Sequence, residues 1–421
     1  MQKKQSGWSW IPTLYFAEGL PYFIVTVISV ILYKRMGVSN SDIALYTSWL
    51  YLPWVIKPFW SPLVEMLGTR RAWINTMQIF IGALLGATAF TIPINNFFQW
   101  TLAIFWLMAF GSATHDIAAD GFYMLGLTGE EQSFFSGIRS IFYRIATIFG
   151  QGVLIIIAGR LEETTGSIIT AWSITFTATA IIMLLVGTYH TKALPTPQSD
   201  ISRNVKGAKE VLHNFVEILI TYFQKPGIGT AILFMLLFRL PEAQLVKMLN
   251  PFLLDSREAG GLALSTEQIG ITYGTIGVIG LIIGGIAGGI AISKKGLKYW
   301  LWPMVMAISL PDLVYVYLSI AQPTNQLIID GCIFIEQIGY GFGFTAYMLY
   351  LIYFAQGKYP TAHYAISTAF MALGMMLPGM VSGYIQEQIG YSNFFIWIMF
   401  CCLATFAVSA MLKIDPDFGK K

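Results

Sequence analysis

The chain has 421 residues, of which 56% are hydrophobic and only 11% are charged, and its mean hydropathy is +0.64. A soluble globular chain is usually about a quarter charged, so this composition excludes an ordinary soluble protein and indicates a protein of the lipid bilayer. The formal net charge of +3 is small, and in a membrane protein the positions of the cations matter more than their sum.

Long apolar windows recur along the whole sequence. A bilayer core about 30 Å thick requires roughly 20 predominantly apolar residues for each helical crossing. Twelve windows meet this requirement, so we predict an all-α integral membrane protein with twelve transmembrane helices. In chain order the windows are 9–34, 41–64, 72–93, 98–125, 136–160, 169–189, 227–254, 269–292, 298–320, 326–356, 362–386 and 392–412.

The first window follows Lys3 and Lys4, as the apolar part of a signal peptide would. It contains Glu18, is too long for such a segment and lacks a clear small-x-small cleavage site. We therefore expect this window to be retained as a true transmembrane helix.

The lysines and arginines are distributed unevenly between the predicted helices. If the N-terminus is cytoplasmic, the cytoplasmic segments hold sixteen of the 25 cations and the opposite loops hold four. Because positively charged loops tend to face the cytoplasm, we expect both termini on that side.

The longest hydrophilic stretch, residues 190–226, divides the windows six and six. We expect an N-terminal bundle over 1–189, a cytoplasmic linker over 190–226 and a C-terminal bundle over 227–421. From Ser199 the linker has apolar residues at helical spacing with lysines between them. This pattern predicts an amphipathic helix along the cytoplasmic membrane surface.

Two loops read like copies of each other. After the second window the chain reads Ser61-Pro-Leu-Val-Glu-Met-Leu-Gly68-Thr-Arg-Arg71, and after the eighth it reads Gly289-Ile-Ala-Ile-Ser-Lys-Lys-Gly296-Leu-Lys298. Parallel repeats are typical of one large transporter class. Both loops resemble the cytoplasmic motif of the major facilitator superfamily, in which a glycine turn and cations pin neighbouring helices, although a basic loop that only sets topology would also fit.

This resemblance implies a major facilitator fold, with two six-helix bundles related by a pseudo-two-fold axis. It also implies that the two loops gate the cytoplasmic side. The residues concerned are Glu65, Gly68, Arg70, Arg71, Lys294, Lys295 and Gly296.

Acidic side chains inside the windows are the main functional signal. An ionisable group near the bilayer centre costs on the order of 2.5–3.5 kcal/mol by insertion scales, so it usually faces a cavity or a partner. In the superfamily fold, helices 1, 4, 7 and 10 line the central cavity, and all but one of the acids fall on them. The acids are Glu18, Asp116, Asp120, Glu242, Asp312 and Glu336.

In the first half of the chain we predict a charged cluster in the cytoplasmic third. Asp116 and Asp120 are four residues apart and share one helix face. Counting a rise of about 1.5 Å per residue places Asp120 level with Arg139 and Asp116 level with Arg144, and Lys57 lies at that depth. The cluster could bind a solute or a proton, or it could only hold three helices together.

In the second half, Arg239 and Glu242 flank Pro241, where a kink is expected. Glu336 lies at a comparable depth, and Glu18 is similarly central in the first window. These residues are candidates for binding a solute or a proton, although pairing with Arg239 would equally explain one of the two nearby acids.

Other signals mainly exclude functions. His115 beside Asp116 is expected to be a satisfied hydrogen-bonding residue. No metalloprotease H-E-x-x-H or phosphate-binding loop occurs, and the three cysteines lack zinc-ligand spacing. We expect no enzymatic activity, no cofactor and no metal, with transport energy taken from an ion gradient.

Several stretches resemble the AmpG-type muropeptide permeases, which are related to acetyl-CoA and siderophore-import transporters. Such proteins import N-acetylglucosamine-anhydro-N-acetylmuramyl peptides across the bacterial inner membrane with protons. The matching stretches are Tyr15-Phe-Ala-Glu-Gly-Leu-Pro21, Lys57-Pro-Phe-Trp-Ser-Pro62, Thr114-His-Asp116-Ile-Ala-Ala-Asp120, Phe142-Tyr-Arg144, Phe238-Arg-Leu-Pro-Glu242 and Phe334-Ile-Glu336. On this resemblance the family's charged positions are occupied by Lys57, Asp116, Asp120, Arg144, Arg239, Glu242 and Glu336.

Two departures bear on the solute. The family often has serine and glutamine where this chain has Thr114 and His115, and Glu18 replaces a small residue. Three interpretations therefore stay open: a proton symporter for muropeptides or similar amino-sugar conjugates, an importer of siderophores or acetyl-CoA, and a non-transporting membrane sensor. The expected partners are a small-molecule substrate, protons and the lipid bilayer, with no nucleic acid, and the resemblance implies a monomer.

Overall fold

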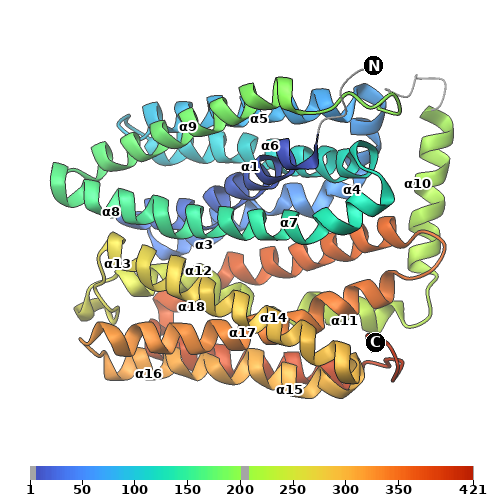
Figure 1. Ribbon diagram of the computed structural model, residues 1–421. Helices are drawn as coiled ribbons and strands as arrows, with labels where there is room; N and C mark the ends of the chain where they lie inside the picture. Colours follow the sequence, from blue (N-terminus) through green and yellow to red (C-terminus); the bar gives the residue numbers. More distant parts are fainter. Residues whose placement is uncertain (1–5, 201–207, 421) are drawn as a thin grey trace. The chain divides into compact units, whose positions relative to one another are not determined.

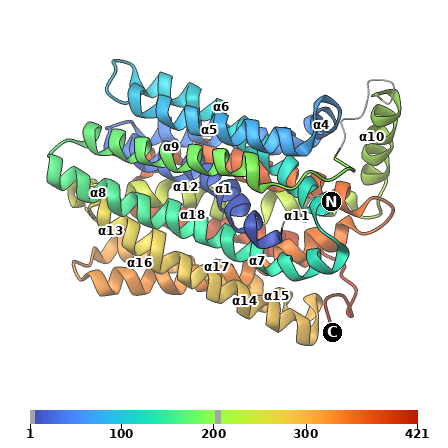
Figure 2. The same ribbon diagram turned by 45° about the horizontal axis from the view of Figure 1, so that its top comes forward.

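The computed structural model describes residues 6–200 and 208–420, and every regular element in these ranges is a helix. Figures 1 and 2 show these helices from two directions. Contacts divide the chain into two compact units. Unit 1 lies within Met1–Leu32 and Ile56–Phe215, and unit 2 lies within Tyr33–Val55 and Val216–Lys421.

The helices of unit 1 are long, and two of them contain a π-helical turn. The first runs through α1, a π turn at Ile24–Ile28 and the start of α2, and another runs from α7 through a π turn at Phe149–Val153 into α8. The bounds are α1 Ile11–Phe23, α2 Ser29–Arg35, α4 Leu52–Leu67, α5 Arg70–Thr91, α6 Phe97–Gly126, α7 Gly129–Ile148, α8 Leu154–Thr165 and α9 Ile168–Ala193.

Unit 2 holds the remaining helices, with α10 beginning in the last residues assigned to unit 1. The bounds are α3 Asn40–Trp49, α10 Ala208–Phe223, α11 Ile228–Leu237, α12 Leu240–Leu254, α13 Thr266–Ile271, α14 Val278–Lys295, α15 Leu297–Ser309, α16 Leu313–Ala321, α17 Gln326–Ala355 and α18 Pro360–Ala410.

Within the described ranges, nine helices are long and apolar enough to cross a membrane. The other predicted windows are present in a different form. Window 41–64 is interrupted between α3 and α4, and window 227–254 is interrupted between α11 and α12, just before Pro53 and Pro241 respectively. Proline lacks the amide hydrogen that a continuous helix requires. The last two windows run together as α18, which bends at Gly390 (φ 73°).

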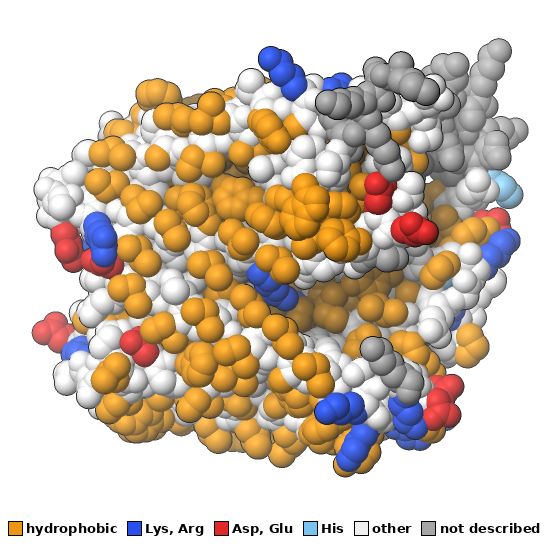
Figure 3. Space-filling model, in the orientation of Figure 1, with side chains coloured by type: hydrophobic (Ala, Val, Ile, Leu, Met, Phe, Trp, Pro, Cys, Tyr) orange, Lys and Arg blue, Asp and Glu red, His pale blue; other side chains and the backbone are white. Residues whose placement is uncertain are grey.

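Large apolar side chains are exposed over much of the surface. Phe90 is 78% exposed, Leu185 65% and Ile286 60%. Hydrophobic side chains cover most of the face shown in Figure 3, and charged side chains lie mainly toward its two ends. A water-facing surface would carry more charge, so this surface fits the hydrocarbon region of a bilayer.

Segment Tyr33–Val55, which we assigned to the N-terminal bundle, makes its contacts with C-terminal helices. Asn40 Nδ2 donates to Gln386 Oε1 (2.7 Å) and to the hydroxyl of Tyr391 (2.9 Å). Lys34 Nζ lies 2.6 Å from Asp255 Oδ1. The division into two six-helix bundles therefore stays a prediction, since contacts group this part of the second window with unit 2.

The linker helix α10 begins at Ala208, and residues 201–207 lie outside the described ranges. On its predicted apolar stripe, Phe215 packs its ring 5.9 Å from that of Phe59, so part of the stripe contacts protein. Glu217 forms an ion pair with Lys358 (2.7 Å). The position of α10 along the membrane surface remains a prediction.

Small residues bring α14 and α17 close together. A Cβ atom on Gly284 would overlap the carbonyl oxygen of Ile338, and one on Gly288 would lie 2.7 Å from Thr345 Oγ1. A close-packing role thus follows for Gly284 and Gly288. It does not extend to Gly289, where a Cβ would meet nothing within 4 Å.

Gly284→Ala should therefore destabilise the fold by about 1–3 kcal/mol, because the methyl group would force α14 and α17 apart. Gly289→Ala is the matched control, and it should be neutral or stabilise by up to about 1 kcal/mol through better helix propensity. Thermal unfolding of the purified protein in detergent measures both. Equal melting temperatures of the two variants would contradict the close packing.

Candidate functional site

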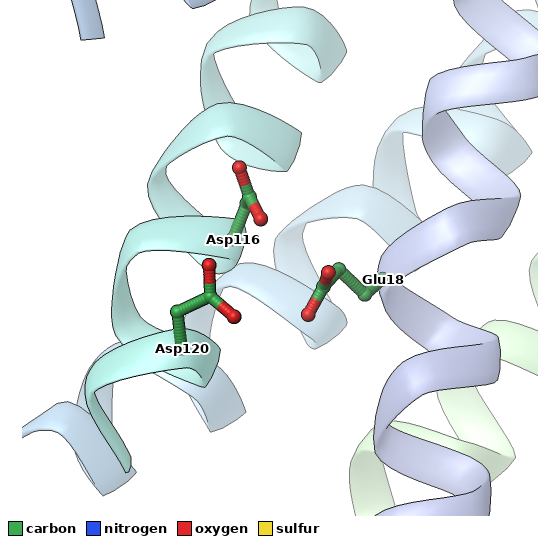
Figure 4. Close-up of side chains that lie close together, drawn as sticks. All are labelled: Glu18, Asp116 and Asp120. Carbon is green, nitrogen blue, oxygen red and sulfur yellow. The ribbon is translucent and has the colours of Figure 1, made fainter. Parts of the chain in front are cut away.

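The predicted charged cluster of the first half is present in unit 1. Asp116 and Asp120 extend from one face of α6 toward Glu18 of α1, as Figure 4 shows. One carboxylate oxygen from each of the three acids lies within 4.8 Å of the others. Lys57 Nζ of α4 forms an ion pair with Asp116 Oδ2, and Arg139 NH2 of α7 lies 3.4 Å from Asp120 Oδ1.

Helix depth left Arg144 and Lys57 as two candidate partners of Asp116. Arg144 is exposed, and no side chain in the described ranges forms an ion pair with it. The residue at the same depth that does reach Asp116 is Lys57. Depth along a helix can be counted from sequence, but the direction in which a side chain points depends on how the helix is rotated in the bundle.

Arg139 is held by aromatic side chains as well as by Asp120. Its guanidinium carbon lies 4.9 Å from the centre of the Tyr15 ring and 5.1 Å from that of Tyr123, and NH1 donates to the hydroxyl of Tyr15 (3.2 Å). Rings on a guanidinium restrict its orientation while leaving its edge free for an anion. The Arg139 side chain is 37% exposed.

The charges of this cluster do not balance. Three acids face Lys57 and Arg139, and Glu18 Oε2 is buried without a hydrogen-bond partner. Three converging carboxylates are the kind of group that holds a cation. Here Lys57 pairs with Asp116 and Arg139 lies near Asp120, although Asp120 Oδ1, like Glu18 Oε2, has no hydrogen-bond partner. Glu18 forms no ion pair in the described ranges, so it has the most capacity for a proton.

In unit 2, Arg239 and Glu242 lie at the break between α11 and α12. Arg239 has non-helical dihedral angles (φ −100°, ψ 17°), so the kink predicted around Pro241 is present. Its NH2 donates to the hydroxyl of Tyr340 (2.7 Å), and its guanidinium carbon lies 4.8 Å from the centre of the Phe344 ring. Glu242 is 7% exposed in the first turn of α12.

Glu336 of α17 is buried, with 2% exposure. Its Oε2 accepts hydrogen bonds from the hydroxyl of Tyr315 (2.6 Å) and from Nε2 of Gln337 (2.9 Å). Both donors are neutral. Glu336 is thus buried among hydrogen-bond donors rather than in an ion pair, in contrast to Asp116.

Two buried charges did not stand out as site residues in the sequence. Lys247 is 1% exposed, donates to Thr47 Oγ1 (2.9 Å) and lies 5.0 Å from the centre of the Tyr51 ring. Asp312 is 3% exposed at a break between α15 and α16. In the sequence, each of the two was visible only as an ionisable residue in an apolar window. That pattern does not show which side chains surround the residue.

The first of the two loops predicted to gate the transporter fastens α5 to neighbouring segments. The backbone amides of Arg70 and Arg71 donate to the two carboxylate oxygens of Asp200 (2.8 and 3.0 Å). Arg71 Nε donates to the carbonyl of Leu194 (3.2 Å), and its NH2 reaches that of Thr191. The anchoring acid is therefore Asp200, which the motif did not indicate, and the side chain of Glu65 is outside the described part.

In the second of these loops, the turn depends on a glycine. Gly296 ends α14 with φ 82°, a left-handed conformation that favours glycine. The next amide, of Leu297, donates to the carbonyl of Phe418 in the C-terminal tail (2.9 Å). Lys295 Nζ lies 3.2 Å from the hydroxyl of Tyr299 in the next helix, and Lys294 is exposed. The two copies therefore anchor their helices differently.

Four helices of unit 1 are joined by a buried polar chain. Gln78 Nε2 donates to His115 Nε2 (2.9 Å), His190 Nδ1 donates to Gln78 Oε1 (2.7 Å), and Thr13 Oγ1 lies 2.8 Å from His190 Nε2. His115 is thus hydrogen-bonded, as expected. Because the amide nitrogen of Gln78 can only donate, His115 Nε2 is the acceptor in this bond and carries no proton.

Gln78→Leu should lower the melting temperature, because two buried histidines would lose a partner at about 1–3 kcal/mol each. The control is Gln99→Leu on the exposed first turn of α6, which should melt like the wild type. Thermal unfolding in detergent compares the three proteins. A Gln78→Leu protein as stable as the control would show that the chain contributes nothing to the fold.

The family description that matches the chain is Major Facilitator Superfamily, over residues 13–383. The anhydromuropeptide permease of Escherichia coli (strain K12) is 24% identical over 390 residues, which cover 91% of this chain and 74% of that protein. A Rickettsia felis transporter named AmpG 4 is 25% identical over 405 residues, covering 92% of this chain and 91% of the relative.

Solved structures also resemble the chain. A D-xylose-proton symporter has a TM-score of 0.71 at 12% identity and covers 98% of each chain. The nucleoside transporter NupG has a TM-score of 0.67 at 14% identity, covering 96% of this chain and 98% of that one. At these identities the likeness shows the fold.

Proposed function

The chain belongs to the Major Facilitator Superfamily, and from this we propose that it imports cell-wall muropeptides, or similar amino-sugar conjugates, by proton symport with alternating access. The observation that carries the proposal is the similarity to the anhydromuropeptide permease over 91% of this chain. The protein would act as a monomer in the bacterial inner membrane with both termini in the cytoplasm.

The charged cluster of unit 1 offers a physical reason for coupling an anionic solute to a proton. Lys57 is bound to Asp116, so a carboxylate on the solute must compete with Asp116 for the same ammonium group. A proton on Asp116 removes that competition. The solute anion and the proton therefore favour each other's binding at this site, which is the requirement for symport.

The other site residues fit supporting roles. Arg139 and Arg239, each held by a tyrosine hydroxyl and an aromatic ring, are suited to a planar carboxylate on the solute. Arg144 is exposed and could do the same. Glu18, Asp120, Glu242 and Glu336 are the acids that could exchange protons with Asp116 or in its place.

Proteoliposomes containing the wild type should accumulate labelled anhydro-muramyl tripeptide disaccharide when an inward proton gradient is imposed. Glu336→Gln should lose gradient-driven accumulation, and Glu163→Gln, at the exposed end of α8, should keep it. No uptake by well-folded wild type would refute the muropeptide assignment and direct the search to siderophores, acetyl-CoA and simple amino sugars.

Asp116→Asn separates binding from coupling. It leaves Lys57 without its anionic partner, so the solute should still exchange across the membrane while uptake loses about fivefold or more of its dependence on the proton gradient. Solute exchange and gradient-driven uptake are measured on the same vesicles. Unchanged gradient dependence would show that Asp116 does not carry the coupling proton.

A further inference from the structure

The helix break between α15 and α16 leaves two buried oxygens without partners. α15 ends at Ser309, a 3-10 turn spans Leu310–Asp312, and α16 starts at Leu313. Asp312 Oδ1 and Ser309 Oγ have no hydrogen-bond partner, although these residues are only 3% and 1% exposed. Buried polar atoms of this kind are rare and call for a ligand such as a water or an ion.

Glu336 faces this break from α17. Its Oε2 accepts a hydrogen bond from the hydroxyl of Tyr315, which lies three residues after Asp312 at the start of α16. The charged groups that act most strongly on Asp312 are Glu336 and then Glu242, and both are acidic. The charged groups with the strongest electrostatic influence on Asp312 are therefore acids, and Tyr315 connects the start of α16 to Glu336.

Arg239 is the one cation among the charged groups named around the acids Glu242, Asp312 and Glu336 in the described part of the chain. Arg239 acts on Glu242, and it is already held by Tyr340 and Phe344. Six titratable or charged groups among the described residues surround this site. They are Arg239, Glu242, Tyr273, Tyr315, Glu336 and Cys402.

A proton fits this group better than a metal ion. Of the acids in the described ranges, only Glu18, Asp116 and Asp120 bring three ligand oxygens within 4.8 Å of one another. Glu242, Asp312 and Glu336 are not so arranged. A proton needs only one carboxylate oxygen, and it removes the buried charge without a ring of ligands.

We propose that Asp312, supported by Ser309 and Glu336, is a second proton-binding site, separate from the Lys57–Asp116 pair. This inference rests on the proposed function, and it implies that two protons accompany each solute. In the binding step one O–H bond forms on Asp312 as one O–H bond of a hydronium ion breaks, and no electrons are transferred.

The first test measures how many protons are transported with each solute molecule. It uses proteoliposomes whose membrane voltage is clamped by potassium and valinomycin. Accumulation of the labelled disaccharide should rise with the square of the imposed proton ratio in the wild type and in simple proportion in Asp312→Asn. Asp330→Asn is the matched control, since the Asp330 carboxylate is already bonded to Thr272 and Gln326, and it should behave like the wild type.

A square dependence that survives in Asp312→Asn, or a simple proportion in the wild type, would overturn the proposal. If the wild type moves no disaccharide at all, the proposed function fails, and the site is then judged by a second test that needs no solute.

The second test follows the melting temperature of the full chain in detergent between pH 6 and pH 9, in choline chloride and in sodium chloride. Wild type and Asp330→Asn should lose stability as the pH rises and Asp312 releases its proton, because a bound ligand stabilises the folded state. Asp312→Asn should lose about half as much or less, since its amide binds no proton. If Asp312→Asn does not fold, Asp312→Ser replaces it in this test.

Equal pH dependence in wild type and the Asp312 variants would overturn the site. Restoration of the wild-type melting temperature at pH 9 by sodium but not by choline would overturn the assignment to a proton.

Discussion

The cost of burying charge in an apolar surrounding is the constraint on which the rest of the structure depends. A chain that is only 11% charged nevertheless places acids and cations inside its helices. The two units meet this cost differently. Unit 1 pairs Asp116 with Lys57 and brings Arg139 near Asp120, whereas unit 2 surrounds Glu336 with neutral donors. An ion pair can release its partner to a solute, and a carboxyl among neutral donors can hold a proton.

Several of the buried charged residues lie at breaks between helices. The carbonyl of Phe238, freed at the break before Pro241, accepts from Thr405 Oγ1 (2.9 Å), and that of Ser309, freed before Pro311, lies 4.0 Å from Cys402 Sγ. One helix, α18, thus provides neighbours for two breaks. Interrupted helices are where membrane transporters bind ions and solutes, because freed backbone groups and helix ends line the site.

Close helix packing and buried hydrogen bonds stabilise the helix bundles that contain these breaks. Gly284 and Gly288 allow α14 to approach α17, and Gln78 joins His115 to His190 across unit 1. In lipid there is little hydrophobic driving force between helices, so contact of backbones and buried hydrogen bonds must supply the adhesion. We propose that Glu18 and His115, where the chain departs from the AmpG-type pattern, affect the choice of solute.

The sequence by itself determined the membrane class, the positions of the helical windows, the kink at Pro241 and the closeness of Asp116, Asp120, Lys57 and Arg139. These follow from composition, from the length needed to cross a bilayer and from the helical rise. Only the tertiary structure decided that Lys57 rather than Arg144 pairs with Asp116, that Asp200 anchors Arg71, and that Asp312 lies beside Glu336. The reason is that depth can be counted along a helix, whereas the rotation of each helix and the choice of its neighbours arise from packing among segments distant in the chain.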